Sequence, residues 1–398
     1  MAVIGTGLIG TSIGLAASRQ GTTVFLSDRD PVAARTAAAL GAGRAEDPDR
    51  PVDLAVLAVP PSQVGGVLAE LQARGFADCY TDVASVKAGP ERAALRQAPE
   101  PARYIGGHPL AGRERSGPLA ARADLFQARP WVLTPSSQTS AAALRRAREL
   151  VLLCGAVPVM ARSRAHDDAV ALTSHVPHLV ASLMAARLRE GPDRLSRFAG
   201  QGLRDVTRIA RGDSRLWGDI LQSNAASIIG VVRDLHADLG RLLAALDALA
   251  EPEDGDGPAD GDERAVGMRT MVDLLDRGIA GLDRLPAPGA GGTAEDSRVR
   301  VAVADRPGEL SRLLDALAGF GVAADDVTVE DTSQGAVVGP AAVRRLTRGG
   351  LTVRFAVAPP VADRVVAELV AGGWAAGGEE RRSARRYGEA RALPVVRT

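Results

Sequence analysis

The residues that most constrain the fold are three glycines at the start of the chain, in the pattern Gly5-x-Gly7-x-x-Gly10. They follow a short apolar run and open a helical pattern rich in Ala, Leu and Ile, and the next predicted strand ends at Asp28. A strand, a glycine-rich turn and a helix, with an acidic residue further along, are typical of dinucleotide-binding domains. The first glycine permits the tight turn, the second lets the backbone approach a pyrophosphate, and the third allows close helix packing. The sequence therefore predicts a Rossmann domain.

The same unit predicts the cofactor. The start of the helix offers free N–H groups and a favourable dipole to a phosphate. The Asp28 carboxylate would accept hydrogen bonds from ribose hydroxyls and repel a 2′-phosphate, which favours NAD over NADP, and the neighbouring Arg29 weakens that preference. The predicted cofactor contacts are Gly5, Gly7, Leu8, Ile9, Gly10, Asp28, Arg29, Val59, Pro60 and Ser85.

Hydrophobic periodicity divides the larger part of the chain into two domains. Residues 1–160 alternate apolar strands with helical stretches, which predicts a doubly wound α/β sheet. Residues 161–285 contain long helical stretches and no convincing strand, which predicts an all-α domain. An acidic segment rich in Gly and Pro, residues 251–263, is expected to be a disordered loop within it.

The remaining residues predict a linker, a small module and a tail. Residues 286–296 are rich in Gly, Pro and Ala, as a flexible linker is. Residues 297–376 read as strand, turn and helix followed by further strands and a helix, with an apparent insertion at 333–350 and a poorly marked fourth strand. We expect a small α+β module here. The Arg-rich segment 377–398 is expected to be a mobile tail.

Composition and charge exclude several classes of function. The formal net charge is zero, so the basic excess of a nucleic-acid or membrane-surface protein is missing. No apolar run reaches the roughly 18 residues of a membrane-spanning helix, and the first residues lack the features of a signal peptide. Cys79 and Cys154 are the two cysteines, and each lies in an apolar stretch. Buried free thiols in a reducing cytosol are expected, and hence a cytoplasmic protein.

One histidine stands out as a candidate reacting group. His108 lies in "YIGGHPLAGRERSG", and the chain has only five histidines. The preceding glycine pair and the following proline predict a tight turn there. A neutral imidazole on such a turn suits general-base work near neutral pH, although a purely structural turn histidine has the same pattern. Lys87, the single lysine of the chain, has either a role near the site or a place on the surface.

Four separated motifs carry a resemblance to a known family. They are "TDVASVK" (81–87), "GGHPLAGRERSG" (106–117), "HDDAVALTSHVPH" (166–178) and "GLRDVTRIARGDSRLWGDI" (202–220). In this order, and with the glycine motif, they resemble the prephenate/arogenate dehydrogenase family of tyrosine biosynthesis over about residues 2–285. The resemblance implies an NAD-dependent oxidative decarboxylation. A hydride leaves the ring carbinol for NAD, carbon dioxide leaves the opposite ring carbon, and the ring becomes aromatic. It also implies a homodimer formed through the helical domain.

The resemblance implies roles for the central residues of these motifs. His108 matches the family's catalytic histidine, which takes the hydroxyl proton. Ser85 matches a serine that bonds to this histidine and to the substrate hydroxyl, and it would fix the tautomer of His108; capping of the following helix is an alternative or additional role. His175 matches a histidine that contacts substrate, and Arg208 an arginine that binds the ring carboxylate.

Further residues of the motifs are implied near the substrate. Arg204 lies one turn before Arg208, where it either assists in binding or pairs with an acid such as Asp205. Asp205 and Trp217 match positions near the substrate, although Trp217 could also simply pack between helices. Glu114 matches an acidic position near the substrate side chain, and Arg113 replaces a small hydroxyl residue found in many relatives. This departure leaves prephenate and arogenate both open, with prephenate preferred.

A metal site is not expected. His175 and His178 lie about one helical turn apart, but no further ligands follow at metal spacing. His178 is more simply a packed helix histidine.

The C-terminal module carries a second resemblance. The stretch "VADRPGELSRLLDALAGFGV" is similar to the first strand, loop and helix of an ACT domain, the ferredoxin-like module that senses amino acids. The resemblance implies that tyrosine or another aromatic amino acid binds here and inhibits the enzyme. A dimerisation module without a ligand is the alternative.

Two competing interpretations are less well supported by the residues. A β-hydroxyacid dehydrogenase has the same two-domain arrangement but uses a lysine base in its helical domain, and residues 161–285 contain no lysine. A non-catalytic, NAD-binding amino-acid sensor would lack reacting groups, whereas His108, Ser85, His175 and Arg208 are all present.

Overall fold

The computed structural model of the chain forms two compact units, Met1–Ile279 and Ala280–Thr398. The structure describes residues 1–112, 115–190, 198–250, 258–285, 297–304, 306–322, 327–331, 350–357 and 359–378.

A seven-stranded sheet organises the first unit, in the order β2-β1-β3-β4-β5-β6-β7. Strands β1 to β5 all run in the same direction. Strand β6 is antiparallel to β5, and β7 is parallel to β6. The predicted Rossmann-type α/β sheet is confirmed, but the reversal at β6 and the existence of β7 were not predicted, because apolar runs carry no direction. The strands are β1 (Ala2–Ile4), β2 (Phe25–Ser27), β3 (Val52–Leu57), β4 (Ala77–Asp82), β5 (Tyr104–Pro109), β6 (Pro130–Thr134) and β7 (Val157–Met160).

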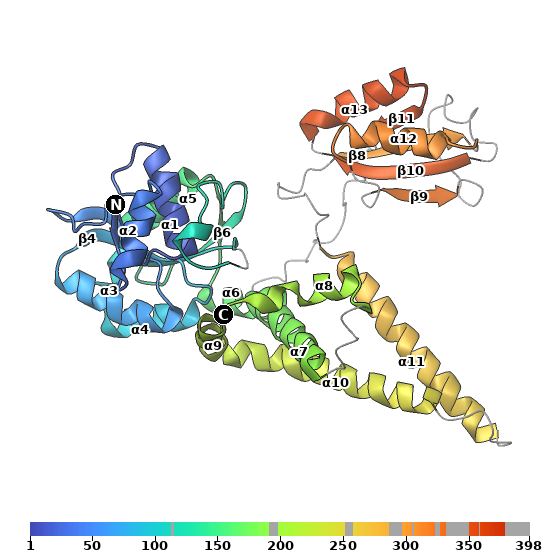
Figure 1. The fold of residues 1–398 in the computed structure, drawn as a ribbon, viewed down its shortest axis with the longest axis horizontal. Coiled ribbons are helices and arrows are strands. Elements are labelled where there is room, and N and C mark those ends of the chain that lie inside the picture. Colours follow the sequence, from blue (N-terminus) through green and yellow to red (C-terminus); the bar gives the residue numbers. More distant parts are fainter. Residues whose placement is uncertain are drawn as a thin grey trace, which may run out of the picture. The chain divides into compact units, whose positions relative to one another are not determined.

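Helices cover both faces of this sheet (Figure 1). On one face, buried residues of α1, α2 and α5 share a core cluster with the strands. On the other face, α3 and α4 form a second cluster. Burial on both faces explains why β3 reads as a continuous apolar run. The helices are α1 (Leu8–Arg19), α2 (Pro31–Ala39), α3 (Val64–Ala73), α4 (Ala88–Gln97) and α5 (Ala141–Leu153).

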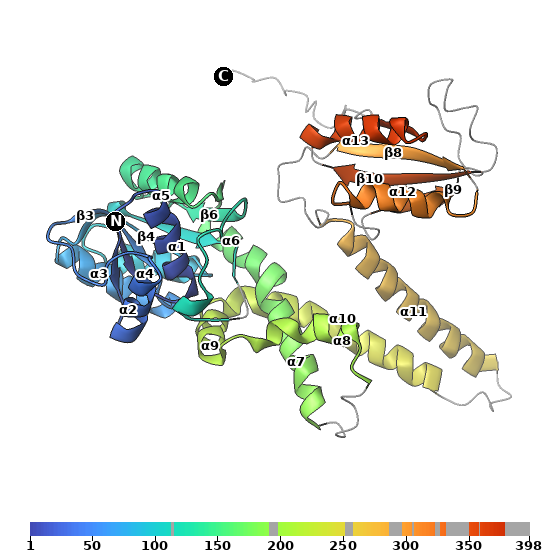
Figure 2. The same ribbon diagram turned by 45° about the horizontal axis from the view of Figure 1, so that its top comes forward.

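The rest of the first unit is helical (Figure 2). Among the described residues between 161 and 285 no strand occurs, in agreement with the predicted all-α domain. The elements are α6 (Ser163–Val170), the π-turn η4 (Ala171–His175), α7 (Val176–Glu190), α8 (Gln201–Thr207), the 3₁₀ turn η6 (Arg208–Arg211), α9 (Ser214–Ser223), α10 (Ala225–Ala250) and α11 (Pro258–Leu282).

The acidic segment 251–263 is only partly a loop. Helix α11 begins at Pro258, so the prediction of a loop is wrong for the second half of the segment. Proline is favoured at the first position of a helix, and the acidic residues that follow suit a helix N-terminus. Residues 251–257 lie outside the described part.

A π-turn joins α6 to α7 next to Pro177. The Val176 N–H donates to the Ala171 carbonyl, five residues earlier instead of four. Because Pro177 has no N–H, the regular hydrogen-bond ladder cannot continue through it, and the wider turn accommodates the break. This π-turn is of a kind common at functional sites, and His175 is its last residue.

The second unit contains a four-stranded antiparallel sheet in the order β11-β8-β10-β9. One core cluster joins this sheet to α12 and α13. The order of elements, β-α-β-β-α-β, is that of ferredoxin-like modules. The elements are β8 (Ser297–Ala304), α12 (Glu309–Ala318), β9 (Thr328–Asp331), β10 (Gly350–Val357), α13 (Pro359–Ala371) and β11 (Ala375–Gly378).

Strand β11 is the poorly marked fourth strand of the prediction. It runs to Gly378, so residues 377–378 belong to the sheet and not to the predicted tail. The predicted linker 286–296, most of the predicted insertion 333–350 and residues 379–398 lie outside the described residues.

Candidate functional site

The glycine turn between β1 and α1 is shaped for a phosphate. A Cβ on Gly5, whose φ is +98°, would lie 2.2 Å from the Ala58 carbonyl oxygen, and a Cβ on Gly10 would lie 1.9 Å from the Gly5 oxygen. A Cβ on Gly7 would meet no atom within 4 Å. Two of the glycines are thus required by the protein itself, while Gly7 faces open space at the start of α1. This cradle fits a dinucleotide pyrophosphate held on a helix N-terminus.

Asp28 lies beside this turn, at the end of β2. Its Oδ2 accepts hydrogen bonds from the Thr6 N–H at 2.6 Å and the Thr6 hydroxyl at 3.0 Å, and its Oδ1 accepts from the Asp30 N–H at 2.9 Å. Arg29 next to it is exposed. These bonds fix the carboxylate at the edge of the sheet where a ribose would lie.

The other predicted cofactor contacts lie close to that edge. Leu8 and Ile9 are the first residues of α1, and half-buried Val59 and Pro60 follow β3. Because β1, β2 and β3 are parallel neighbours, their carboxyl ends meet at one edge of the sheet. Ser85 is half-buried in the segment after β4. The predicted contacts thus follow adjacent parallel strands, where ligands of such sheets bind.

His108 lies in a strand and not on the predicted turn. It belongs to β5 and is paired with Val132 of β6. The glycine pair before it serves close packing: a Cβ on Gly106 would lie 2.5 Å from Thr134 Oγ1, and one on Gly107 would lie 2.8 Å from the Asp82 carbonyl oxygen. The prediction of a turn is therefore wrong, because crowding by neighbouring strands, and not chain reversal, requires these glycines.

The ring of His108 contacts a second histidine. His108 Nδ1 lies 2.8 Å from His166 Nε2, and His166 Nδ1 lies 2.9 Å from Asp167 Oδ1. The Asp167 carboxylate also accepts hydrogen bonds from the Lys87 N–H at 2.7 Å and the Ala88 N–H at 2.8 Å. The bond to His108 Nδ1 thus comes from His166. Both roles implied for Ser85, the fixing of the His108 tautomer and the contact with a substrate hydroxyl, stay predictions.

Sequence reasoning missed His166 and Asp167 as site residues. They were present in the third motif, but no local pattern connects them to His108, which is 58 positions away. The only local signal was a histidine next to an acid at the start of an apolar helix.

Desolvation keeps the half-buried His108 imidazole neutral. Desolvation lowers its pKa well below the ordinary value, and repulsion from Lys87, and from His166 and His175 when these are protonated, acts in the same direction. A neutral imidazole is able to accept a proton at neutral pH. The electrostatics of the site therefore suit a general base.

His175 is a buried donor. Asn224 Nδ2 donates to the Asp167 carbonyl at 2.8 Å, which identifies this atom as the amide nitrogen, and it also lies 3.1 Å from His175 Nδ1. His175 Nδ1 is therefore the acceptor, and its proton is on Nε2. That Nε2 is buried without a hydrogen-bond partner among the described residues. Burial lowers the pKa of His175 to about 4. A neutral ring with an unsatisfied N–H is suited to an acceptor on a ligand.

Trp217 lies between two histidines. Its ring stacks on His178 with centroids 3.6 Å apart, and the His175 ring is edge-on at 6.2 Å. Trp217 Nε1 lies so close to Gly212 that a Cβ there would come within 2.2 Å of it. The structure thus joins Trp217 to the histidine cluster, and His178 is the packed helix histidine that was predicted.

The predicted carboxylate-binding residues lie on α8 and η6. Arg204 and Asp205 are exposed on α8, and Asp205 accepts a hydrogen bond from Gln201 Nε2 at 2.8 Å. Arg208 begins η6, which packs against α7, the helix that carries His178. Arg113 and Glu114 lie outside the described residues. Binding of substrate by these side chains stays a prediction.

Lys87 is buried beneath the strand that carries His108. Its side chain has no exposed surface and forms an ion pair with the equally buried Asp82. Lys87 Nζ also donates to the Gly107 carbonyl at 2.6 Å, and the Tyr104 hydroxyl donates to Asp82 Oδ2 at 2.6 Å. Desolvation lowers the pKa of Lys87, and the charge of Asp82 opposes this effect. The interpretation of Lys87 as a surface lysine is wrong.

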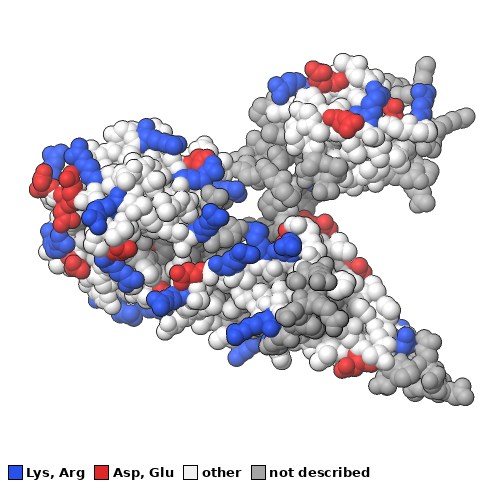
Figure 3. Space-filling view, in the orientation of Figure 1, with Lys and Arg blue, Asp and Glu red and all other residues white. Residues whose placement is uncertain are grey.

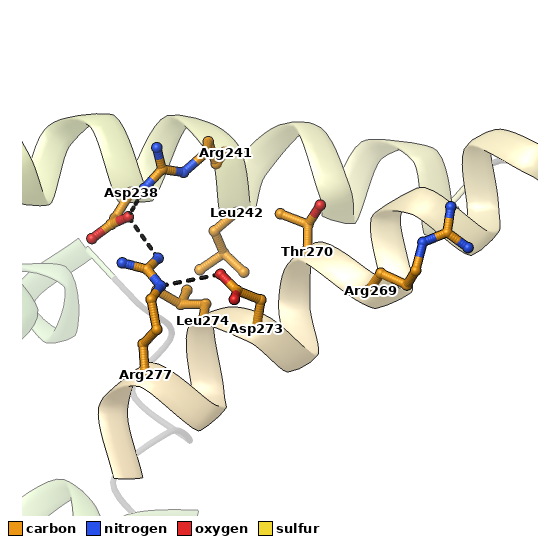
Figure 4. Close-up of a pocket in the computed structure, with 8 residues that line it drawn as sticks. All are labelled: Asp238, Arg241, Leu242, Arg269, Thr270, Asp273, Leu274 and Arg277. Carbon is orange, nitrogen blue, oxygen red and sulfur yellow. Dashed lines mark hydrogen bonds and ion pairs between the residues drawn. The ribbon is translucent and has the colours of Figure 1, made fainter. Parts of the chain in front are cut away.

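The surface charges do not mark an alternative site. On the face shown in Figure 3, acidic and basic side chains of the described residues are interspersed. A groove of about 300 Å³ lies between α10 and α11 (Figure 4). Its charges pair with each other: Arg277 donates to Asp238 at 2.9 Å and to Asp273 at 3.1 Å. Exposed ion pairs of this kind are worth little.

One helical stretch among the described residues, Ser163–Arg189, is long and apolar enough to cross a membrane, and 33% of its most apolar window is buried. It meets these limits on length and mean hydropathy, although polar residues such as Thr173, Ser174 and His175 interrupt its apolar sequence. The stretch carries His166, Asp167 and His175, whose side chains are buried and hydrogen-bonded to other parts of the first unit. It is a core helix of that unit, with an apolar remainder that is exposed in the single chain.

Two family models match most of the first unit. Residues 13–160 match the family described as "Prephenate dehydrogenase, nucleotide-binding domain", and residues 162–256 match "Prephenate dehydrogenase, dimerization domain". The chain is 43% identical over 379 residues to "Probable prephenate dehydrogenase NovF" of Streptomyces niveus, covering 94% of this chain and 98% of the relative. It is 32% identical over 268 residues to a cyclohexadienyl dehydrogenase of Zymomonas mobilis, covering 64% and 90%.

A solved structure has the same fold. It is prephenate dehydrogenase from A. aeolicus in complex with hydroxyphenyl propionate and NAD+, with a TM-score of 0.57 and 23% identity. The similarity covers 70% of this chain and 97% of the other.

Proposed function

The chain belongs to the prephenate dehydrogenase family, and from this premise we propose that it catalyses the NAD-dependent oxidative decarboxylation of prephenate to 4-hydroxyphenylpyruvate. The observation that carries the proposal is the position of His108. It is a half-buried, neutral imidazole. The same compact unit holds the glycine turn, with open space at Gly7, and the buried His175, whose Nε2–H has no partner among the described residues.

Each residue of the site has a separate role in the proposed reaction. NAD, when bound, supplies the hydride acceptor. The glycine turn and Asp28 hold the dinucleotide at the carboxyl edge of the sheet. His108 accepts the proton of the substrate hydroxyl, a kind of help that gives about 10²–10⁴-fold in rate. His175 donates its free Nε2–H to an oxygen of the substrate, and Arg208 binds the ring carboxylate.

The assembly proposed for the enzyme is a homodimer formed through the helical domain. Large apolar side chains on three helices are well exposed in the single chain, among them Leu183 at 69%, Leu239 at 62% and Leu275 at 61%. Exposed apolar surface of this kind marks protein interfaces. The matching of residues 162–256 to a dimerization domain supports the same assembly.

The C-terminal unit is proposed to be a regulatory ACT-like domain. Its β-α-β-β-α-β order and the sequence Asp305-x-Pro307-Gly308 support this assignment. Bound tyrosine would inhibit the enzyme. The full chain is assayed with and without saturating tyrosine, and its thermal stability is measured alongside; unchanged rate and unchanged stability would reject tyrosine as the ligand.

The two buried free cysteines support a cytoplasmic location.

The experiment for the main proposal compares NADH formation from prephenate and from arogenate. We expect prephenate to be turned over faster. His108→Asn should lower kcat by about 10²–10⁴-fold with NAD binding retained. The matched control is His236→Asn, since His236 is exposed on α10. Failure of the wild type to form NADH from either compound would reject the proposed function.

A further inference from the structure

We propose that His166 and Asp167 form a positioning dyad that sets the tautomer of His108 and takes over its positive charge during the reaction. This inference rests on the proposed function and adds two residues to it. The side chains of both are about 2% exposed and form a continuous hydrogen-bonded chain to His108.

The direction of each hydrogen bond follows from Asp167. Its carboxylate accepts from the N–H groups of Lys87 and Ala88, at the start of α4, so it is fixed in place as an acceptor. His166 Nδ1, at 2.9 Å, must therefore carry the proton of that bond. A neutral His166 then has an unprotonated Nε2, which accepts from His108 Nδ1 at 2.8 Å.

The consequence for His108 is a defined tautomer. With its proton on Nδ1, the Nε2 of His108 is unprotonated and free to act as the base. When Nε2 takes the hydroxyl proton, the ring becomes an imidazolium. The Nδ1 proton then moves to His166 Nε2, and His166 becomes the cation, beside the Asp167 carboxylate. The carboxylate stays ionised, and the extra proton returns through His108 to solvent after the product leaves.

The surroundings of His108 favour movement of the positive charge from His108 to His166. Desolvation is the largest effect that opposes a positive charge on His108, and Lys87, the cation of the buried pair with Asp82, opposes it as well. A second positive charge on His108 is therefore unfavourable in this environment. Movement of the charge to His166 places it against an anion that is already held by two backbone N–H groups.

The first test is Asp167→Asn, with Asp168→Asn as the matched control. Asp168 is the next residue on α6, but its side chain is 53% exposed and pairs with Arg164 at 3.2 Å. An amide at 167 cannot accept from all three donors. If its NH₂ faces His166, both histidines change tautomer and Nε2 of His108 becomes protonated. We expect kcat to fall by roughly 10²-fold, with KM and NAD affinity little changed, and the control to stay within about twofold.

The second test reads the tautomer directly. The chain has five histidines, so ¹⁵N-histidine NMR of the resting full-length protein is tractable. We expect His108 to carry its proton on Nδ1 in the wild type and in Asp168→Asn. A wild-type proton on His108 Nε2 would overturn the dyad, whatever the activity of the enzyme.

A further variant, at His166, tests the proposal even if Asp167→Asn does not fold. His166→Gln retains an acceptor for His108 but cannot take up a proton. We expect a lowered kcat and an unchanged KM, and wild-type kcat in this variant would contradict the charge transfer. Absence of turnover in the wild type would instead reject the proposed function, and the NMR result would still decide the tautomer.

Discussion

Burial of neutral histidines has a measurable thermodynamic consequence at the scale of single residues. Desolvation lowers the pKa of His175 to about 4 and that of His108 well below its ordinary value, and it lowers that of His178. In the unfolded chain the same rings titrate near pH 6.5. Between these values the unfolded state binds more protons than the folded state.

We therefore expect the free energy of unfolding to fall as the pH is lowered from about 6.5 to about 4. His175→Gln should reduce this dependence, because the glutamine has no proton to gain. Denaturant unfolding at several pH values measures both slopes. His236→Gln, on the exposed face of α10, is the control and should retain the wild-type slope. Equal slopes in all three proteins would contradict the assignment.

At the scale of an element, the β1–α1 turn separates two roles of glycine. Gly10 is required by packing, because a Cβ there would meet the Gly5 carbonyl oxygen at 1.9 Å. Gly7 has open space in front of it. The chain itself tolerates a side chain at Gly7, whereas a bound pyrophosphate would not.

Gly7→Ala should accordingly leave the melting temperature close to that of the wild type and weaken NAD binding at least tenfold. Gly10→Ala should lower the melting temperature. Thermal unfolding without cofactor and NAD titration by calorimetry distinguish the two. If Gly7→Ala binds NAD normally, the pyrophosphate does not lie at this turn.

The elements also show what local sequence could predict. The β1–α1–β2 unit and the long helices were predictable, because their periodicity and glycines act within a few residues. The strand position of His108 was not, since a glycine pair before proline has the pattern of a turn and its real cause, Thr134 and Asp82, lies on neighbouring strands. The bond between His108 and His166 depends on packing of α6 against the sheet domain, which no spacing reveals.

At the scale of the whole molecule, the exposed apolar helices predict an association. Leu239→Glu together with Leu275→Glu should convert a dimer into a monomer, because two charges would be buried in an apolar interface. Sedimentation velocity at micromolar concentration measures the change. Val32→Glu, at an exposed apolar position of α2 outside the helical domain, should leave the dimer intact. A wild type that sediments as a monomer would contradict the proposed assembly.

The burial of Lys87 also determines how the folded molecule meets amine-directed reagents. It is the single lysine of the chain, and its side chain has no exposed surface. Amine-directed acylating labels and cross-linkers should therefore spare the Lys87 side chain of the native protein. The lysine becomes accessible when the sheet around Asp82 opens. The rate at which Lys87 becomes labelled then measures the rate at which the nucleotide-binding domain unfolds.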